Sequence, residues 1–178
     1  MAAPITRLGY ALLGLIRGEP RSGYALRRVF ETTPISTYSS SPGSIYPALK
    51  GLEKAGLVAQ RPPTGAKRVY HLTEAGEAAL RTWLTAPVEE EEVGKRLDMA
   101  LLRFAFLEVL QDRAATLNFL DSFESAARAH AASLARFLEG ASESALTPQG
   151  RIAVEHGLKT ILCSAAWAAD ARRRLREG

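Results

Sequence analysis

Apolar residues recur every three or four positions through the first part of the chain, which is the spacing of helices with one buried face. This pattern predicts a helix over residues 6–17, ended by the Gly-Glu-Pro sequence at 18–20. It predicts a second helix after Ser22, a residue type that caps helix N-termini well. A third helix is predicted over 41–56, behind a segment rich in Ser and Thr. Three helices in quick succession therefore open the chain.

The pattern then changes from helical spacing to short strand-like runs. Residues 57–58 and 69–72 are such runs, and the turn-forming sequence Pro-Pro-Thr-Gly lies between them. Thr73 and Glu74 begin another helical pattern. Three helices, a two-stranded wing and a fourth helix are the order of a winged helix-turn-helix. Residues 1–86 are therefore interpreted as a DNA-binding domain of that type.

Helical spacing without strand signals returns in the second half. Residues 87–95 carry four consecutive glutamates, whose mutual repulsion predicts an acidic linker or an acidic helix start. Residues 96–178 are interpreted as an all-helical dimerisation domain, so the predicted fold class is mainly α. Apolar positions alternate there in steps of three and four, as in packed or coiled helices. The residues predicted to form the dimer interface are Leu120, Phe123, Ala127, Leu134, Phe137, Leu158, Ile161, Ala165 and Ala168.

Charge is distributed unevenly over the 178 residues. The chain has a net charge of +4, yet residues 1–86 carry +6 and residues 87–178 carry −2. A basic front half favours an anionic partner there. The single cysteine, Cys163, excludes an intramolecular disulfide and is interpreted as a buried, inert thiol. With no apolar run of membrane-spanning length and no signal-peptide pattern, we expect a cytoplasmic protein without membrane contact.

The third predicted helix has two different sides. Ile45 and Leu49 fall on an apolar side, whereas small, aromatic and cationic residues fall on the other. Small residues near the start of a helix allow close approach to the DNA major groove, and its free N–H groups suit a phosphate. Ser41 and Ser44 are both candidate N-caps. The predicted DNA contacts are Ser41, Gly43, Ser44, Tyr46, Pro47, Lys50 and Lys54 on this helix, Lys67 and Arg68 on the wing, and Arg27 and Arg28 on the second helix.

Simpler interpretations of these residues stay open. Tyr46 could fill the core of the small domain, and Lys50 and Lys54 could be an ordinary solvated face. The winged domain could also bind an acidic protein partner instead of sequence-specific DNA. No motif of a hydrolase, a nucleotide-binding loop or a zinc protease is present, and no two histidines are spaced three or four apart. No enzymatic activity, metal or cofactor is therefore predicted.

Three stretches resemble the PadR family of bacterial transcriptional regulators. They are LGYALLGLIRGEPRSGYALRRVF at 8–30, SPGSIYPALKGLEKAGLV at 41–58 and RVYHLTEAGEAAL at 68–80. The resemblance covers about the first 85 residues closely, and the back half looks like the longer helical domain of one subgroup. It implies a homodimer that binds a two-fold symmetric DNA operator and usually represses nearby genes. Some members respond to phenolic acids or multidrug-type ligands, but no pocket motif identifies a small-molecule effector here.

Overall fold

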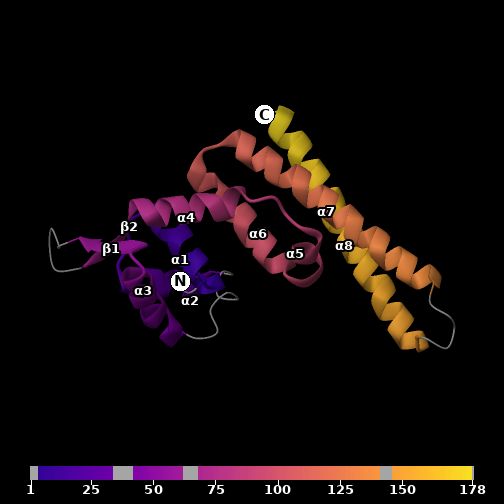
Figure 1. Ribbon diagram of the computed structural model, residues 1–178, viewed down its shortest axis with the longest axis horizontal. Coiled ribbons are helices and arrows are strands. Elements are labelled where there is room, and N and C mark those ends of the chain that lie inside the picture. The colour runs from indigo at the N-terminus through magenta and orange to yellow at the C-terminus, as the bar shows by residue number, and fades with distance from the viewer. Residues whose placement is uncertain (1–3, 34–41, 62–67, 141–145, 178) are drawn as a thin grey trace. The chain divides into compact units, whose positions relative to one another are not determined.

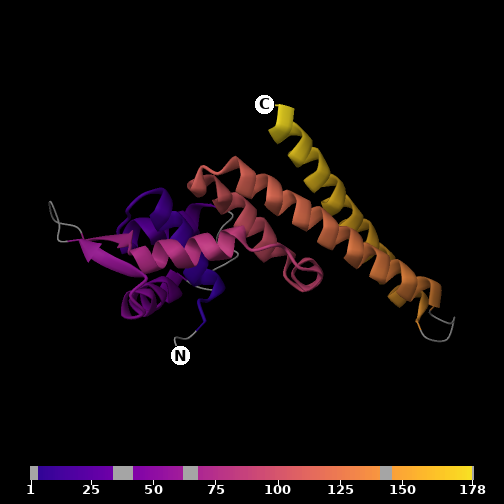
Figure 2. The same ribbon diagram turned by 45° about the horizontal axis from the view of Figure 1, so that its top comes forward.

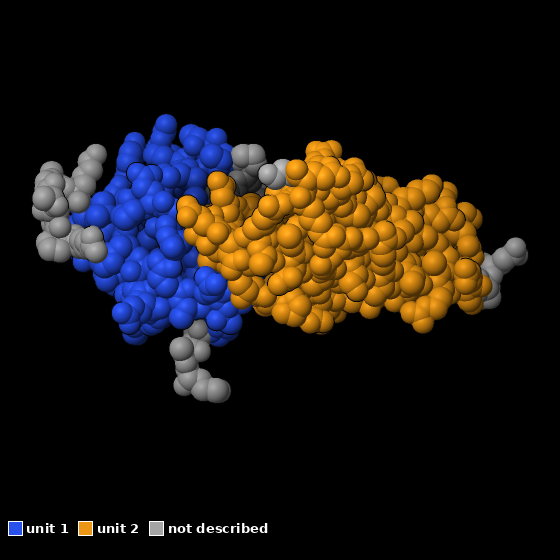
Figure 3. Space-filling view, turned by 90° about the horizontal axis from the view of Figure 1, so that it is seen from above, with its two compact units in different colours: residues 1–84 blue, residues 85–178 orange. Residues whose placement is uncertain are grey.

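The computed structural model describes most of the chain, in two compact units. The described residues are 4–33, 42–61, 68–140 and 146–177. Unit 1 comprises residues 1–84 and unit 2 comprises residues 85–178 (Figure 3). Helices dominate both units, and a two-stranded antiparallel sheet is formed in unit 1 (Figure 1). The predicted fold class, mainly α with an N-terminal winged helix-turn-helix, is confirmed.

Unit 1 contains the elements of a winged helix-turn-helix in the predicted order. They are α1 (Arg7–Gly18), α2 (Gly23–Thr32), the 3-10 turn η2 (Pro42–Ser44), α3 (Ile45–Lys54), β1 (Val58–Arg61), β2 (Val69–Leu72) and α4 (Glu74–Thr85). Thr6 caps α1 by accepting a hydrogen bond from the N–H of Gly9, 3.1 Å away. The core between the helices is apolar, and its fully buried members include Leu12, Leu26 and Leu49. Burial of the apolar side chains on one face of each helix holds α1, α2 and α3 together.

The wing joins the helices through a small number of backbone contacts. Strands β1 and β2 pair antiparallel, with Val58 opposite Leu72. Gly56, at φ 71°, turns the chain out of α3 in the left-handed conformation that glycine adopts readily. Thr73 then closes the unit, because its Oγ donates to the carbonyl of Gly56 at 2.6 Å and accepts from the N–H of Gly76 at 3.1 Å. Both ends of the wing are thus fixed to the helical core.

Unit 2 is helical over the part of it that the structure describes. Its elements are α5 (Glu90–Lys95), α6 (Leu97–Phe106), the 3-10 turn η3 (Leu107–Leu110), α7 (Arg113–Gly140) and α8 (Pro148–Glu177). Helices α7 and α8 run beside each other in opposite directions (Figure 2). At one end Arg151 donates to the carbonyl of Leu138, and at the other Arg113 donates to the carbonyl of Leu175. The long helices therefore form an antiparallel hairpin.

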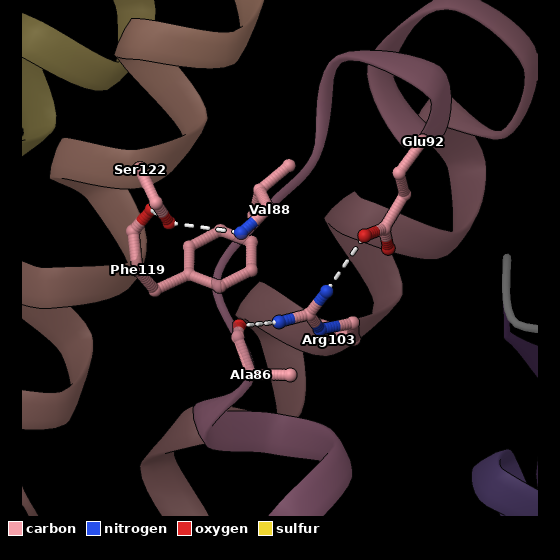
Figure 4. A network of polar contacts seen from close by, with 6 residues as sticks. All are labelled: Ala86, Val88, Glu92, Arg103, Phe119 and Ser122. Atoms are coloured by element: carbon pink, nitrogen blue, oxygen red, sulfur yellow. Dashed lines mark hydrogen bonds and ion pairs between the residues drawn. The ribbon is translucent and has the colours of Figure 1, made fainter.

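Residues 87–95, for which the sequence left open an acidic linker or an acidic helix start, contain helix α5, with three glutamates in its first turn. Val88 and Val93 are buried, and α5 packs on α6 and α7. Arg103 of α6 forms an ion pair with one of the glutamates. The Arg103 side chain is 3% exposed, and its Nη1 lies 2.7 Å from Oε2 of Glu92 (Figure 4). The acidic run thus folds into unit 2 because a partner side chain eleven residues further along neutralises part of it.

The same buried arginine fixes the chain at the start of unit 2. Its Nη2 donates to the carbonyl of Ala86, and its guanidinium carbon lies 5.2 Å from the centre of the Phe119 ring. The N–H of Val88 donates to Oγ of Ser122 at 3.1 Å, beside this cluster (Figure 4). Arg103 therefore links α6 to α5, to α7 and to the chain that precedes them.

The predicted dimer-interface residues lie mostly inside the chain itself. Within unit 2, α7 and α8 cover one another, and Trp167 of α8 meets the rings of Phe104 and Phe123 edge-on, at 5.0 and 5.4 Å. Only Phe137 of the predicted set is clearly exposed, at 51%, and Leu134 and Leu158 are half-buried. The six buried ones are Leu120, Phe123, Ala127, Ile161, Ala165 and Ala168. Their spacing identifies a packed face, but the helix that covers it belongs to the same chain.

Two further observations concern chemistry outside the core. Cys163 is exposed on α8, so the prediction of a buried thiol was wrong. Among the described residues, no helix has the length and apolar character to cross a membrane. In the same part of the chain no cluster of three potential metal ligands occurs.

Candidate nucleic-acid interface

The exposed side of α3 carries most of the residues that the sequence predicted as DNA contacts. Ile45, Leu49 and Leu52 are buried against the other helices of unit 1, which fixes the rotation of α3 about its axis. The opposite side faces solvent. Its exposed residues include Tyr46, Pro47, Lys50 and Lys54, and Gly43 of the preceding turn η2 is exposed beside them. The predicted division of this helix into an apolar side and an open side is confirmed, and Tyr46 does not fill the core.

The start of α3 has one of the two predicted serines at its N-cap position. Ser44 stands there, directly after the 3-10 turn η2, but its side chain makes no capping hydrogen bond. Ser44 already has helical backbone angles, with φ −77° and ψ −18°. Continuing helical backbone from the preceding turn takes the place of a cap. Ser41, the other candidate, lies outside the described residues.

The N-terminus of α2 approaches this surface and begins as predicted. Ser22 caps the helix, because its Oγ accepts from the N–H of Ala25 at 3.2 Å. The next residues, Gly23 and Tyr24, lie on the same side as Tyr46, and Tyr24 is 61% exposed. Tyr24 was not among the predicted contacts. The sequence could have indicated that Tyr24 is exposed, because Tyr24 does not fall among the regularly spaced apolar residues of α2.

A groove of about 380 Å³ lies between the start of α2, α3 and the wing. Aromatic and polar side chains line it, including three tyrosines with their hydroxyls and one arginine. The lining residues are Ser22, Gly23, Tyr24, Tyr46, Gln60, Arg68 and Tyr70. Rings that can pack on sugars and groups that can donate to phosphates therefore meet in one concave surface.

Hydrogen bonds hold the wing side of the groove in place. Nε2 of Gln60 donates to Oη of Tyr70 at 3.1 Å and to Oε2 of Glu53 at 3.3 Å, so one amide joins β1, β2 and α3. The N–H of Tyr70 donates to the carbonyl of Arg21 at 2.8 Å, just before α2. Burial, and next the charge of Glu53, raise the pKa of Tyr70 above its ordinary value. The Tyr70 hydroxyl therefore stays a neutral hydrogen-bonding group. The sequence did not single out Gln60 or Tyr70, whose roles depend on contacts across the wing.

The predicted cations differ in how strongly they are already paired. Arg27 binds Glu31 through Nε and Oε1, 2.7 Å apart, and this hydrogen bond raises the pKa of Arg27. Arg28 lies 3.9 Å from the same carboxylate. Lys50 and Arg68 form no ion pair with any described residue and are exposed. These two are better placed to meet an anion, because a phosphate at Arg27 would have to compete with Glu31. Lys67 lies outside the described residues.

Part of the chain matches the model of a known protein family. Residues 12–82 match the model of the transcriptional regulator PadR-like family. The negative transcriptional regulator PadR of Bacillus subtilis is 31% identical over 121 residues, 66% of this chain and 65% of that protein. The transcriptional regulator YqjI of Escherichia coli is 31% identical over 86 residues, 48% of this chain and 40% of that protein. The chain thus aligns with less than two thirds of the length of each relative.

Similar solved structures extend over nearly the whole chain. Bacillus subtilis PadR in complex with operator DNA has 24% identity and a TM-score of 0.43, and covers 97% of this chain and 99% of that chain. The same protein in complex with p-coumaric acid has 24% identity and a TM-score of 0.42, with full coverage of both chains. The PadR-like regulator BC1756 from Bacillus cereus has 23% identity and a TM-score of 0.41.

Proposed function

We propose that the chain, whose residues 12–82 match the PadR-like family of transcriptional regulators, is a repressor of that family that binds a two-fold symmetric DNA operator as a homodimer. Helix α3 enters the major groove, and the wing contacts the neighbouring backbone. Repression is the function named for the Bacillus subtilis relative, a negative transcriptional regulator.

The observation that carries this proposal is the open side of α3. Its inner side is buried, so Tyr46, Pro47 and Lys50 are held outward on a rigid helix. Unit 1 is also the basic part of the chain. Its excess of Lys and Arg over Asp and Glu would attract a polyanionic partner such as DNA. A protein partner would not need small residues at the helix start together with an adjacent basic wing.

Each candidate residue has a distinct role in this proposal. Tyr46 and Ser44, near the start of α3, contact base edges and so supply sequence discrimination. Lys50 and Arg68 bind phosphates and supply affinity without discrimination, and Lys67 acts with Arg68. The remaining candidates support the backbone contact: Gly43 in the turn η2, Pro47 and Lys54 on α3, and Arg27 and Arg28 on α2.

Dimerisation is proposed to use apolar side chains that the hairpin of unit 2 leaves exposed. Phe137 of α7 is 51% exposed, and Ile152 and Leu162 of α8 are 65% and 46% exposed. Large apolar side chains on a long helical surface are typical of an interface between subunits. A dimer would present two copies of α3 about 34 Å apart, one turn of DNA, or a multiple of that spacing.

DNA binding is tested by selecting duplexes from a random pool and measuring their affinity by fluorescence anisotropy. We expect an enriched sequence with two-fold symmetry, bound more tightly than a scrambled duplex and more weakly as salt rises. Tyr46→Ala should reduce the difference between the two duplexes, whereas Lys50→Ala should weaken both. Equal binding to selected and scrambled duplexes would contradict an operator-specific function. Absence of binding even at low salt would favour an acidic protein partner.

The dimer is tested by sedimentation of a Phe137→Glu/Ile152→Glu double variant. We expect a monomer, because each glutamate would have to lose its hydration in the interface. Leu101→Glu, at an exposed apolar residue of α6, controls for the general effect of added charge. A double variant that still sediments as a dimer would place the interface elsewhere.

A further inference from the structure

Gly23 and Tyr46 meet where α2 begins beside α3. Gly23 is buried and follows the cap residue Ser22, whereas Tyr46 is 49% exposed. A Cβ added to Gly23 would lie 2.7 Å from Cε1 and 3.4 Å from Cδ1 of Tyr46. Carbon atoms in ordinary contact are about 3.5–4.0 Å apart. One edge of the Tyr46 ring therefore occupies the space that any larger residue at position 23 would need.

The backbone does not explain this glycine. Among the described glycines, Gly56 has a positive φ, and Gly23 has helical angles that alanine adopts more readily. Helical glycines of this chain are not all packed in this way, because a Cβ added to Gly18 or Gly51 would meet no described atom within 4 Å beyond its chain neighbours and its own helix backbone. Room for the tyrosine ring is the structural reason for glycine at position 23.

The position of the ring matters because Tyr46 belongs to the groove between α2, α3 and the wing. The ring of Tyr46 lines this groove together with Tyr24, Arg68 and Tyr70. A shift of the ring would move a hydrogen-bonding group among these residues. An exposed tyrosine without such packing would populate several rotamers and would lose that freedom on binding.

We propose that Gly23 is a positioning residue: it leaves room for the Tyr46 ring and so holds the Tyr46 hydroxyl in the orientation with which α3 discriminates between DNA sequences. This inference rests on the proposed function for its consequence in DNA binding. The contact itself, between Gly23 and the ring, can be measured in the protein without DNA.

The first experiment measures the contact in the unmodified chain. We expect a nuclear Overhauser effect between the Hα atoms of Gly23 and the ring protons of Tyr46, with Tyr46→Phe used to assign the ring resonances. Gly23→Ala should shift the Tyr46 ring resonances, whereas Gly18→Ala should leave them unchanged. Absence of the Overhauser effect in the unmodified chain would overturn the proposal, whatever the variants do.

The second experiment is a double-mutant cycle read out as the ratio of affinities for the selected and scrambled duplexes. Gly23→Ala should lower this ratio about tenfold, the size expected from one displaced base contact. In a Tyr46→Ala background the same change should have no further effect, because the ring it displaces is absent. Thermal unfolding of each variant verifies that the domain is still folded.

The outcomes separate this inference from the function on which it rests. An equal loss of discrimination in both backgrounds would overturn the positioning role, since Gly23 would then act independently of Tyr46. An unchanged ratio in Gly23→Ala, with normal selectivity in the unmodified protein, would also overturn it. If the unmodified protein selects no sequence, the proposed function fails, and the Overhauser measurement still decides whether Gly23 positions the ring.

Discussion

Replacing Glu92 by Gln should strongly destabilise unit 2. The carboxylate of Glu92 is the ion-pair partner of Arg103, a side chain that is 3% exposed, and the side chain of Glu92 is itself 14% exposed. Removing one partner of a buried pair leaves the other charge without compensation, which costs about 3–5 kcal/mol. Arg103 keeps its hydrogen bond to the carbonyl of Ala86 and its contact with Phe119. We therefore expect a loss near the lower end, about 3 kcal/mol.

A matched control lies on the same helix. Glu91 pairs with Lys95 at 3.2 Å, but the two side chains are 67% and 73% exposed. Exposed pairs of this kind contribute less than about 0.5 kcal/mol, so Glu91→Gln should be almost neutral. Replacing both partners of the buried pair, as Arg103→Met with Glu92→Leu, should restore most of the stability because no unpaired charge then remains.

The assay is equilibrium unfolding in urea, followed by the fluorescence of Trp167 in a Trp83→Phe background. Trp167 packs on Phe104 and Phe123 within unit 2, so its signal reports that unit. The midpoint and slope of the transition give the free energy of unfolding for each variant. If Glu92→Gln loses no more stability than Glu91→Gln, the buried pair does not hold α5 and α6 together, and the reasoning fails.

Three further predictions concern unit 1. Gly76→Ala should destabilise it by more than about 2 kcal/mol, because the new Cβ would lie 1.9 Å from the carbonyl oxygen of Leu57. Gly51→Ala, in open space, should stabilise α3 by about 0.5–1 kcal/mol. Both are measured by urea unfolding followed by the fluorescence of Trp83, which stacks on Tyr10 in unit 1, in a Trp167→Phe background. Burial raises the pKa of Tyr10, so its contribution is present below the unfolded pKa of about 10 and is lost as the pH rises through the higher folded value. Unfolding followed from pH 9 to pH 11 should therefore show a smaller loss of stability in Tyr10→Phe than in the unmodified protein. Arg68→Ala should weaken selected and scrambled duplexes alike and reduce the slope of log affinity against log salt by about 0.9; an unchanged slope would exclude a phosphate contact.

The helices of unit 1 could be predicted from the sequence because their signals are local. Ser22 caps α2 through a hydrogen bond to a residue three positions away. The buried side of α3, with Ile45 and Leu49, follows from helical spacing alone. Where the signal was not local, the prediction was incomplete. Gln60 and Tyr70 meet only because β1 and β2 pair, and this pairing joins residues ten positions apart.

Helix α5 shows how a distant partner changes the meaning of a charge run. Four adjacent glutamates repel one another and by themselves favour an extended segment. In the folded unit, Arg103 binds Glu92, and Val88 and Val93 are buried on either side of the acidic run. Local spacing does not reveal that Arg103 is the partner, so the sequence left open whether the segment is a linker or the start of a helix.

The apolar seam of α7 and α8 illustrates a different limit. Spacing in steps of three and four identified residues such as Phe123 and Ala165, which are indeed buried. It could not tell whether the covering helix comes from the same chain or from a second one, because both arrangements need the same periodicity. The exposed side chains of Phe137 and Ile152 become distinguishable from the seam only once the hairpin is known.

The antiparallel arrangement of α7 and α8 also sets an order for folding. The hydrogen bond from Arg151 to Leu138 closes a separation of 13 residues, whereas that from Arg113 to Leu175 closes one of 62. Because the entropic cost of closing a loop grows with its length, the turns near the connection pair first and the far ends pair last. The far end is also where Arg172 binds Asp121 and Glu124. These ion pairs therefore lie at the end of the hairpin that closes last, where we expect them to slow the hydrogen exchange of the last turns of α8.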